Sequence, residues 1–155
     1  MPTNLYGPGD NFLPENSHVV PALMSRFHAA TWCGEKRVVV WGTGRPQREF
    51  LHVDDLADAA LFLMRHYNSS EIINEGTGVD LTIAALARLV ASVTRFQGEV
   101  PFDPSKPDGT PRKLLDISRL TRLGWTARTP LEEGLKQTYH WFVTSKAASE
   151  IAVKP

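Results

Sequence analysis

Glycine and proline constrain the fold of this chain more than any other feature of its sequence. There are 11 of each among its 155 residues, and they separate segments of about 10 to 20 residues. The β-branched and aromatic runs within those segments are only about three to five residues long, as in short strands. The pattern therefore predicts a mixed α/β architecture in which a few short strands accompany longer helices, and no large sheet.

Four segments have the apolar spacing of amphipathic helices. Ser17 can cap the first of them, and Asp54 and Asp55 suit the N-terminus of the second. The third is expected over residues 81–95, and the fourth from a capping Thr129 to about residue 144. The apolar face of the first is expected to be Val20, Leu23, Met24 and Phe27. That of the second is expected to be Leu56, Ala60, Leu63 and Met64.

The expected strands lie at residues 38–41, 49–53 and 72–74, and residues 1–6 are expected to form a short extended piece. Residues 98–116 are rich in proline and polar residues and show few regular signals. A short helical turn is expected at residues 118–123, closed by Gly124. Cys33 is expected in a loop before Gly34, with no functional role.

Composition excludes several classes of protein. Seventeen basic residues balance seventeen acidic ones, whereas a nucleic-acid-binding domain is normally strongly basic. A single cysteine, Cys33, rules out an internal disulfide framework. No apolar stretch approaches the roughly 20 residues of a membrane span, and the N-terminus lacks the order of a signal peptide. We therefore expect a cytoplasmic protein that binds neither nucleic acid nor membrane.

The common catalytic motifs are absent from these 155 residues. No G-x-G-x-x-G, P-loop, H-E-x-x-H, C-x-x-C or G-x-S-x-G occurs. The tyrosines Tyr6, Tyr67 and Tyr139 are not followed four residues later by lysine, so no Tyr-x-x-x-Lys pair exists. The pair of acids at residues 54–55 has no further ligands nearby, and no metal site is predicted.

One local cluster has the composition of a nucleotide-binding surface. Residues 41–50 place Trp41 and two arginines, Arg45 and Arg48, around a Gly/Pro turn. A tryptophan offers a flat face for stacking, and an arginine offers a bidentate fork for phosphate. The alternative is a hairpin with solvated arginines and a half-buried tryptophan, and the residues alone do not separate the two.

Three further features have both a plain and a functional interpretation. Arg26 is placed near the end of the first helix, where a surface cation is the commoner role. His18 can be a polar residue of the first helical turn or an acid/base group. Residues 106–113 carry three cations and Asp108 among turn residues, and they form either a solvated loop or a lid over an anionic ligand.

Taken together, these segments resemble one family. Residues 48–57 (REFLHVDDLA) and 74–78 (NEGTG) are similar to motifs of the extended short-chain dehydrogenases that act on nucleotide sugars, the NAD-dependent epimerase/dehydratase family. Residues 1–8, 16–23 and 105–116 further resemble its GDP-L-fucose synthase branch. The resemblance covers residue 1 to about residue 143. Glu75, at a place usually apolar, and a short loop at residues 68–71 depart from the pattern.

The resemblance implies a fold and an activity. The fold is the C-terminal part of a Rossmann-like extended short-chain dehydrogenase with its smaller substrate-binding α/β subdomain, expected here over residues 1–144 with a frayed tail at 145–155. The activity is 3,5-epimerisation of GDP-4-keto-6-deoxy-D-mannose, followed by NADPH-dependent reduction at C4, in a homodimer. That family carries its Gly-rich fingerprint, catalytic Ser and Tyr-x-x-x-Lys in an N-terminal half. We therefore expect this chain to be a fragment that is inactive alone.

The resemblance also implies roles for particular residues. Pro2, Thr3, Asn4 and Leu5 would line the nicotinamide end of an NADP site. His18 would lie near cofactor and sugar as a catalytic acid/base. The GDP-sugar would be bound by Arg26, Trp41, Arg48 and Asp108. Two alternatives stay open: another nucleotide-sugar epimerase or dehydratase, and a non-catalytic module that binds a sugar nucleotide.

Overall fold

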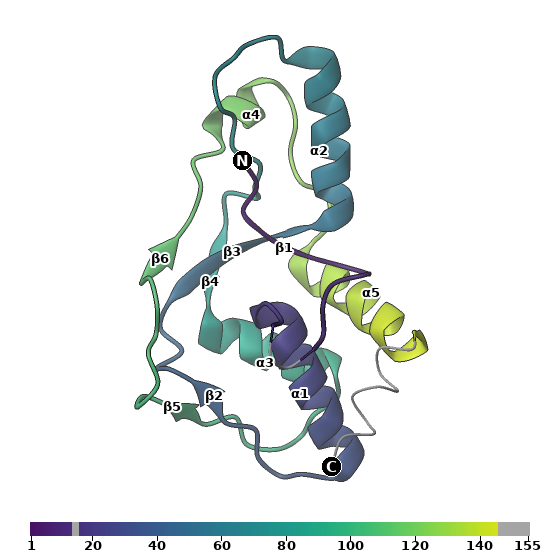
Figure 1. The fold of residues 1–155 in the computed structure, drawn as a ribbon, viewed down its shortest axis with the longest axis vertical. Coiled ribbons are helices and arrows are strands. Elements are labelled where there is room, and N and C mark those ends of the chain that lie inside the picture. The colour runs from purple at the N-terminus through teal and green to yellow at the C-terminus, as the bar shows by residue number, and fades with distance from the viewer. Residues whose placement is uncertain (14–15, 146–155) are drawn as a thin grey trace.

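A computed structural model describes residues 1–13 and 16–145. Within these ranges the chain forms a mixed α/β fold (Figure 1). The elements, in chain order, are β1 (Asn4–Tyr6), α1 (Val19–Cys33), β2 (Val40–Trp41), β3 (Gln47–His52), α2 (Val53–His66), β4 (Asp80–Thr82), α3 (Ile83–Val93), β5 (Phe102–Asp103), β6 (Arg112–Lys113), α4 (Ser118–Arg122) and α5 (Leu131–Thr144). Apart from residue 145, the expected frayed tail lies outside the described residues.

Strand β3 organises the main sheet, because each of its halves pairs with a different parallel strand. Its first two residues pair with β6, and its last three pair with β1 in the register Asn4 to Phe50 through Tyr6 to His52. Strand β4 pairs antiparallel with residues 47–49. A separate parallel pair joins β2 to β5. Residues far apart in sequence therefore meet along one six-residue strand.

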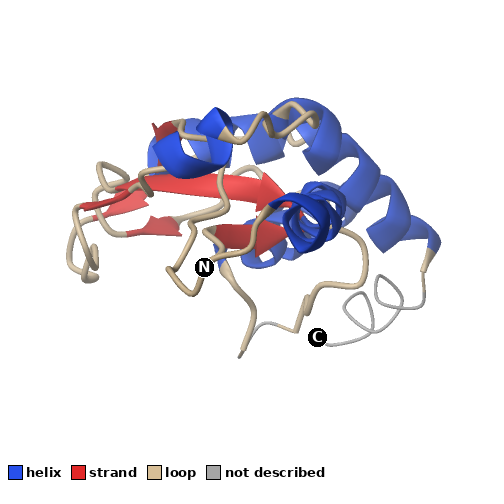
Figure 2. Ribbon diagram, turned by 90° about the horizontal axis from the view of Figure 1, so that it is seen from above, coloured by secondary structure: helices blue, strands red, loops and turns tan. Residues whose placement is uncertain are grey.

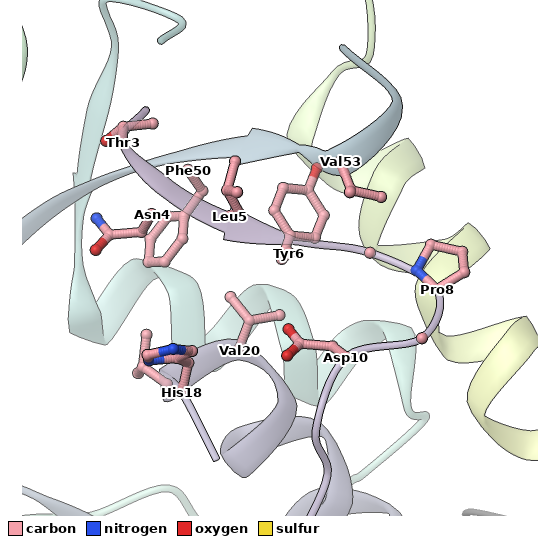
Figure 3. Close-up of a pocket in the computed structure, with 13 residues that line it drawn as sticks. Thr3, Asn4, Leu5, Tyr6, Pro8, Asp10, His18, Val20, Phe50 and Val53 are labelled. Atoms are coloured by element: carbon pink, nitrogen blue, oxygen red, sulfur yellow. The ribbon is translucent and has the colours of Figure 1, made fainter. Parts of the chain in front are cut away.

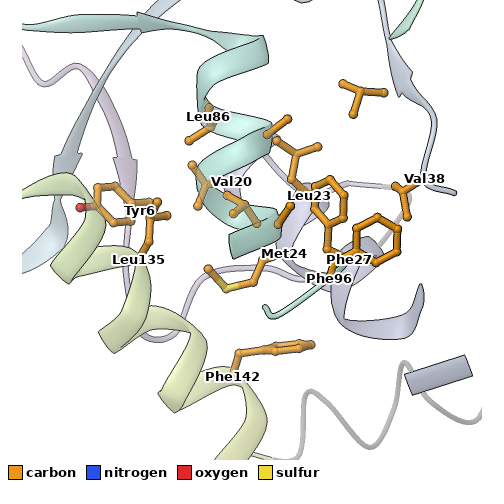
Figure 4. Packing of buried hydrophobic residues seen from close by; sticks show 14 of the residues in the cluster. Tyr6, Val20, Leu23, Met24, Phe27, Val38, Leu86, Phe96, Leu135 and Phe142 are labelled. Atoms are coloured by element: carbon orange, nitrogen blue, oxygen red, sulfur yellow. The ribbon is translucent and has the colours of Figure 1, made fainter. Parts of the chain in front are cut away.

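The alternation of side chains along β3 divides the apolar core in two. Phe50 faces a large cluster built from α1, α3 and α5, whereas Leu51 faces a smaller cluster with Ala59, Leu120 and Trp125. Strands β1 and β3 thus separate α1 and α3 from α2 and α4, as Figure 1 shows. Figure 2 shows the strands and helices of the same fold from above. Figure 4 shows the large cluster around Met24, which has no exposed surface. Both faces of the strand are covered, as is usual in parallel α/β sheets.

The first helix confirms the predicted apolar face and corrects its ends. Val20, Leu23, Met24 and Phe27 are all buried. The N-cap is His18 rather than Ser17, and no side chain caps the helix. At the other end α1 extends through Cys33 to a left-handed Gly34, so Cys33 is an exposed helical residue and not part of a loop. The longer helix also places Arg26 near its middle.

The prediction for the buried face of α2 is confirmed for two of its four residues: Leu56 and Leu63 pack, partly buried, against the smaller cluster, whereas Ala60 and Met64 are exposed. Its buried residues are Asp55 and Ala59, while Met64 is 82% exposed and Leu61 is 55% exposed. Hydrogen bonds of a polar side chain explain why Asp55 is buried. The Asp55 carboxylate accepts hydrogen bonds from the backbone N–H groups of Arg128 (3.3 Å) and Thr129 (2.9 Å). Asp55 therefore turns inward to hold the segment before α5, and the apolar residues of α2 are turned partly outward.

Several predicted boundaries also move. Residues 72–74 form no strand, and the strand near them is β4, which was not predicted. Because β2 pairs with β5 rather than β3, the hairpin interpretation of residues 41–50 is wrong. Helix α3 begins at Ile83, after Thr82 caps it through a bond from the N–H of Ala85 (3.1 Å). Pro130, not Thr129, is the N-cap of α5.

None of the helices within the described ranges has the length and hydropathy needed to cross a bilayer.

The exposed apolar side chains of α2 predict self-association of the chain. We expect Leu61→Lys with Met64→Lys to shift the protein toward monomer in sedimentation velocity, without lowering its melting temperature, because both side chains lie at the surface. The control is Leu120→Ala, in the core, which should destabilise by about 2–5 kcal/mol and leave association no weaker. An unchanged sedimentation profile for the double lysine variant would contradict this prediction.

Candidate functional site

A cavity of about 430 Å³ lies between β1 and the N-terminus of α1 (Figure 3). It is lined by two stretches of chain and two residues of β3 and α2: Thr3, Asn4, Leu5, Tyr6, Gly7, Pro8, Gly9, Asp10, His18, Val19, Val20, Phe50 and Val53. Most of the wall is therefore the strand β1 and the loop that follows it. A cavity at the carboxyl end of a parallel strand is the usual place for a ligand in an α/β sheet.

Two of the polar residues in this wall are fixed by the neighbouring strand. The side-chain amide of Asn4 donates to the backbone oxygen of Glu49 at 2.7 Å, and the Thr3 hydroxyl donates to the same oxygen at 3.4 Å. Figure 3 shows Asn4 and His18 on one side of the cavity and Asp10 on the other. His18 is exposed at the start of α1, where its imidazole is accessible to a ligand.

Tyr6 is buried at the end of β1 and has a different environment. Its ring meets His52 edge-on with 5.4 Å between ring centroids, and its hydroxyl donates to the backbone oxygen of Leu131 at 3.5 Å. Burial, and then the charge of Asp55, raise the pKa of Tyr6 far above its ordinary value. Tyr6 is therefore a neutral packing residue at neutral pH, and it supplies no phenolate to the cavity.

Pro2 lies apart from the lining residues. It pairs with Glu75 through a parallel bridge, in which the N–H of Thr3 donates to the oxygen of Glu75 at 3.0 Å and the N–H of Glu75 donates to that of Met1 at 3.0 Å. Of the four residues expected near the nicotinamide, the structure therefore brings Thr3, Asn4 and Leu5 to the cavity wall and leaves Pro2 just beyond it.

A second group of site residues gathers around Trp41, which is 68% exposed. The ammonium of Lys106 lies 5.6 Å from the centre of a Trp41 ring. One oxygen of Asp108 accepts from the backbone N–H of Thr43 at 2.6 Å, and the other accepts from its hydroxyl at 2.7 Å. Gly42 permits this approach, because a Cβ there would lie 2.4 Å from the carboxylate. Asp108 thus attaches the 104–111 loop to the turn after β2.

The two arginines predicted for the substrate lie near this loop and near β2. Arg48 donates to the backbone oxygen of Gln47 at 2.7 Å, and its guanidinium lies 3.7 Å from the position of a Cβ on Gly109. Arg26 donates to the backbone oxygen of Val39, and burial lowers its pKa from the ordinary value. Trp41, Arg48 and Asp108 therefore come together at one surface, and Arg26 reaches the strand that carries Trp41.

One central residue was missed by the sequence reasoning. Glu49 has no exposed surface, and its carboxylate accepts backbone N–H groups from Thr77, Gly78 and Leu115. The available signal was the Gly76-Thr77-Gly78 turn, which offers consecutive N–H groups to an anion. Within residues 1–13 and 16–145, no group of three or more His, Cys, Asp or Glu side chains is arranged to hold a metal ion.

Comparison with known proteins decides the family. The model of the NAD dependent epimerase/dehydratase family matches residues 1–76. A probable GDP-L-fucose synthase 1 of Oryza sativa is 61% identical over 92% of this chain, and the GDP-L-fucose synthase of Escherichia coli is 54% identical over 94%. This chain belongs to the NAD-dependent epimerase/dehydratase family. It spans 44% and 48% of those two relatives, about half their length, and corresponds to their C-terminal part.

Solved structures of the family agree with the fold. A GDP-L-fucose synthetase from Naegleria fowleri bound to NADP superposes with a TM-score of 0.87 at 37% identity, covering 92% of this chain and 45% of that one. A GDP-D-glycero-L-gluco-heptose synthase from Campylobacter jejuni, solved in the presence of NADPH, gives 0.82 at 32% identity, over 93% and 52%. The expected fold, the C-terminal part of a Rossmann-like epimerase, is confirmed.

The Asp108–Thr43 contact makes a prediction about one pKa. Hydrogen bonds from the Thr43 hydroxyl and backbone N–H lower the pKa of Asp108, so the contact is complete above the ordinary value of about 3.9 and is lost as the pH falls through the lowered one. We expect Thr43→Val to raise this pKa toward the ordinary value, measured by a carbon NMR titration of the carboxyl. Thr110→Val, in the same loop, should leave it unchanged. A Thr43→Val titration identical to wild type would refute the contact.

Proposed function

We propose that this chain is the GDP-sugar-binding part of a GDP-L-fucose synthase. That enzyme converts GDP-4-keto-6-deoxy-D-mannose to GDP-L-fucose by 3,5-epimerisation and NADPH-dependent reduction at C4. The observation that carries the proposal is the 54–61% identity to proteins of that name. The exposed tryptophan and the arginine beside the 104–111 loop support it independently, because they suit a base and a pyrophosphate.

In this proposal the nucleotide lies over the surface around Trp41. The indole stacks on the base or sugar, and the guanidinium groups of Arg48 and Arg26 bind the pyrophosphate. Partial burial lowers the pKa of Arg26, although the residue keeps exposed surface, and its guanidinium stays charged at any physiological pH. An anion beside it would offset that cost. Asp108 contacts the substrate from the 104–111 loop, or holds the loop in place for it through Thr43.

The cavity beside β1 would serve the reduction step by holding part of the cofactor. Its position at the end of a parallel strand and its mixture of amide, hydroxyl and apolar groups suit the nicotinamide end of NADP. Thr3, Asn4 and Leu5 would hold that end, with Pro2 just beyond the wall, and the cofactor would supply hydride for a ketone. The Asn4 amide is already oriented by its bond to Glu49, so it would meet the ligand with little reorganisation.

His18 is the proposed acid/base group. A ketone at C4 acidifies the C–H bonds at C3 and C5, so one acid/base set that includes His18 can serve both epimerisations before reduction removes the ketone. Each inversion removes a proton from one face of the sugar and returns one to the other, so His18 would act with a partner group, which the resemblance places outside this chain. An imidazole can both accept and donate a proton near neutral pH. His18 lies at the cavity with Asn4, where a sugar next to the nicotinamide would reach its imidazole.

Two other assignments remain as alternatives. A UDP-glucose 4-epimerase from Thermotoga maritima gives a TM-score of 0.79 at 30% identity, so the fold alone does not separate GDP from UDP. The chain can also serve as a non-catalytic module that binds a sugar nucleotide. A homodimer of the whole enzyme and a cytoplasmic location stay predictions, drawn from the resemblance and from composition.

Nucleotide binding is tested directly by calorimetry with GDP, UDP and dTDP. We expect weak binding that prefers GDP. Trp41→Ala and Arg48→Ala should each reduce the affinity about tenfold, or about 1.4 kcal/mol, because one removes the stacking face and the other a phosphate contact. Trp32→Ala is the matched control, since Trp32 is also exposed but lies on α1. A preference for UDP would instead favour the related epimerases.

Catalysis by the isolated chain is expected to be absent. These 155 residues contain neither a Gly-rich fingerprint for the dinucleotide nor a Tyr-x-x-x-Lys pair for protonation of the reduced ketone. We expect no loss of NADPH absorbance when the purified chain is mixed with NADPH and GDP-4-keto-6-deoxy-D-mannose. A relative that carries both motifs serves as the positive control. Measurable turnover by the chain alone would overturn the expectation.

A further inference from the structure

Glu49 occupies the point at which β3 changes its parallel partner. Residues Gln47 and Arg48 pair with β6, and residues from Phe50 to His52 pair with β1. Glu49 lies between the two ladders and is fully buried. It is also the immediate neighbour of Arg48, the arginine proposed to bind the pyrophosphate. Whatever fixes Glu49 therefore fixes the relation between the cavity beside β1 and the surface around Trp41.

The carboxylate of Glu49 has three backbone donors. One oxygen accepts from the N–H groups of Thr77 and Gly78, both at 2.7 Å, and the other accepts from that of Leu115 at 3.1 Å. Gly76 is required for this approach, because a Cβ there would lie 2.4 Å from the carboxylate. A buried carboxylate is stable only when its lone pairs are used in this way. The three donors therefore explain why an acid is tolerated here.

The bond from Leu115 matters for the nucleotide surface because Leu115 lies just beyond the loop that covers it. That loop carries Lys106 over Trp41 and passes Gly109 close to the guanidinium of Arg48. It is attached near its middle by Asp108 to Thr43. Beyond its far end the chain contacts β3 twice: β6 pairs with residues 47–48, and the N–H of Leu115 then donates to Glu49.

We propose that Glu49 is a positioning residue for nucleotide binding. It holds residues 112–116, and with them the 104–111 loop, against Arg48 and Trp41. This inference rests on the proposed function of those two residues. Glu49 does not touch the ligand and acts through Leu115 and β6. A carboxylate is needed because both of its oxygens accept, whereas a carboxamide has one acceptor and one donor.

The substitution Glu49→Gln isolates this role. Its remaining oxygen can keep the bonds to Thr77 and Gly78, and its NH2 group then faces the N–H of Leu115, donor against donor. We expect amide hydrogen exchange of residues 104–116 to quicken at least tenfold in the unliganded chain, with α1, α3 and α5 unchanged. In calorimetry the affinity for GDP should fall about tenfold. Glu133→Gln, at an exposed position of α5, is the matched control and should alter neither quantity.

The possible results separate this inference from the proposed function. If wild type binds GDP and Glu49→Gln binds it equally well, the inference is overturned. If wild type binds no GDP, the proposed function fails. Hydrogen exchange then decides whether Glu49 positions the loop: faster exchange supports it, and unchanged exchange overturns it.

A second variant covers the case in which Glu49→Gln does not fold. Leu115→Pro removes a single donor to the carboxylate and leaves those of Thr77 and Gly78 in place. We expect faster exchange over residues 104–114 and weaker GDP binding, with an unchanged far-ultraviolet circular dichroism spectrum. A Leu115→Pro chain that keeps wild-type exchange and affinity would overturn the proposal in the same way.

Discussion

The burial of one carboxylate, that of Glu49, is the constraint on which the rest of this structure depends. Removing a charge from water is costly unless protein donors replace the lost hydration. The N–H groups of Thr77, Gly78 and Leu115 do so, and each belongs to a segment with little regular structure of its own. This short sheet can therefore hold long irregular segments in place. The Glu49 side chain, in its central strand, binds them where no strand pairing does.

The local elements with strong internal signals were predictable from sequence, and the elements made by distant contacts were not. The apolar spacing of Val20, Leu23, Met24 and Phe27 predicted a buried face, and all four are buried. The predicted strand at residues 72–74 is absent. Its two isoleucines favour extended structure, but no strand in the described part of the chain pairs with them. In α2 the periodicity correctly placed Leu56 and Leu63 against the core. It did not predict that Asp55 is buried, because that carboxylate accepts hydrogen bonds from the N–H groups of residues 128–129. Long-range polar contacts of this kind leave no periodic trace.

The candidate site divides in the same way. Trp41 and Arg48 could be selected from composition around a Gly/Pro turn, and the structure places both beside the 104–111 loop. His18 and Arg26 depended on the resemblance, because an isolated histidine or arginine has no distinguishing pattern. The contact of Asp108 with Thr43 spans 65 positions, and the Glu49 carboxylate joins β3 to residues 77–78 and 115. Neither could be inferred without the fold.

The lysine above Trp41 has a consequence for how the surface meets a base. In the unliganded chain the indole already has a cation within about 6 Å of its face, a contact worth about 0.5–1 kcal/mol at an exposed position. In the proposed function, a purine that stacked on the same face of the indole would displace that ammonium. The competition lowers apparent affinity by no more than about fivefold, and the displaced charge becomes available to the phosphates of the same ligand. The loop thus places a cation beside an exposed aromatic ring in the absence of ligand, and the same cation would be available to the site when the proposed ligand arrives.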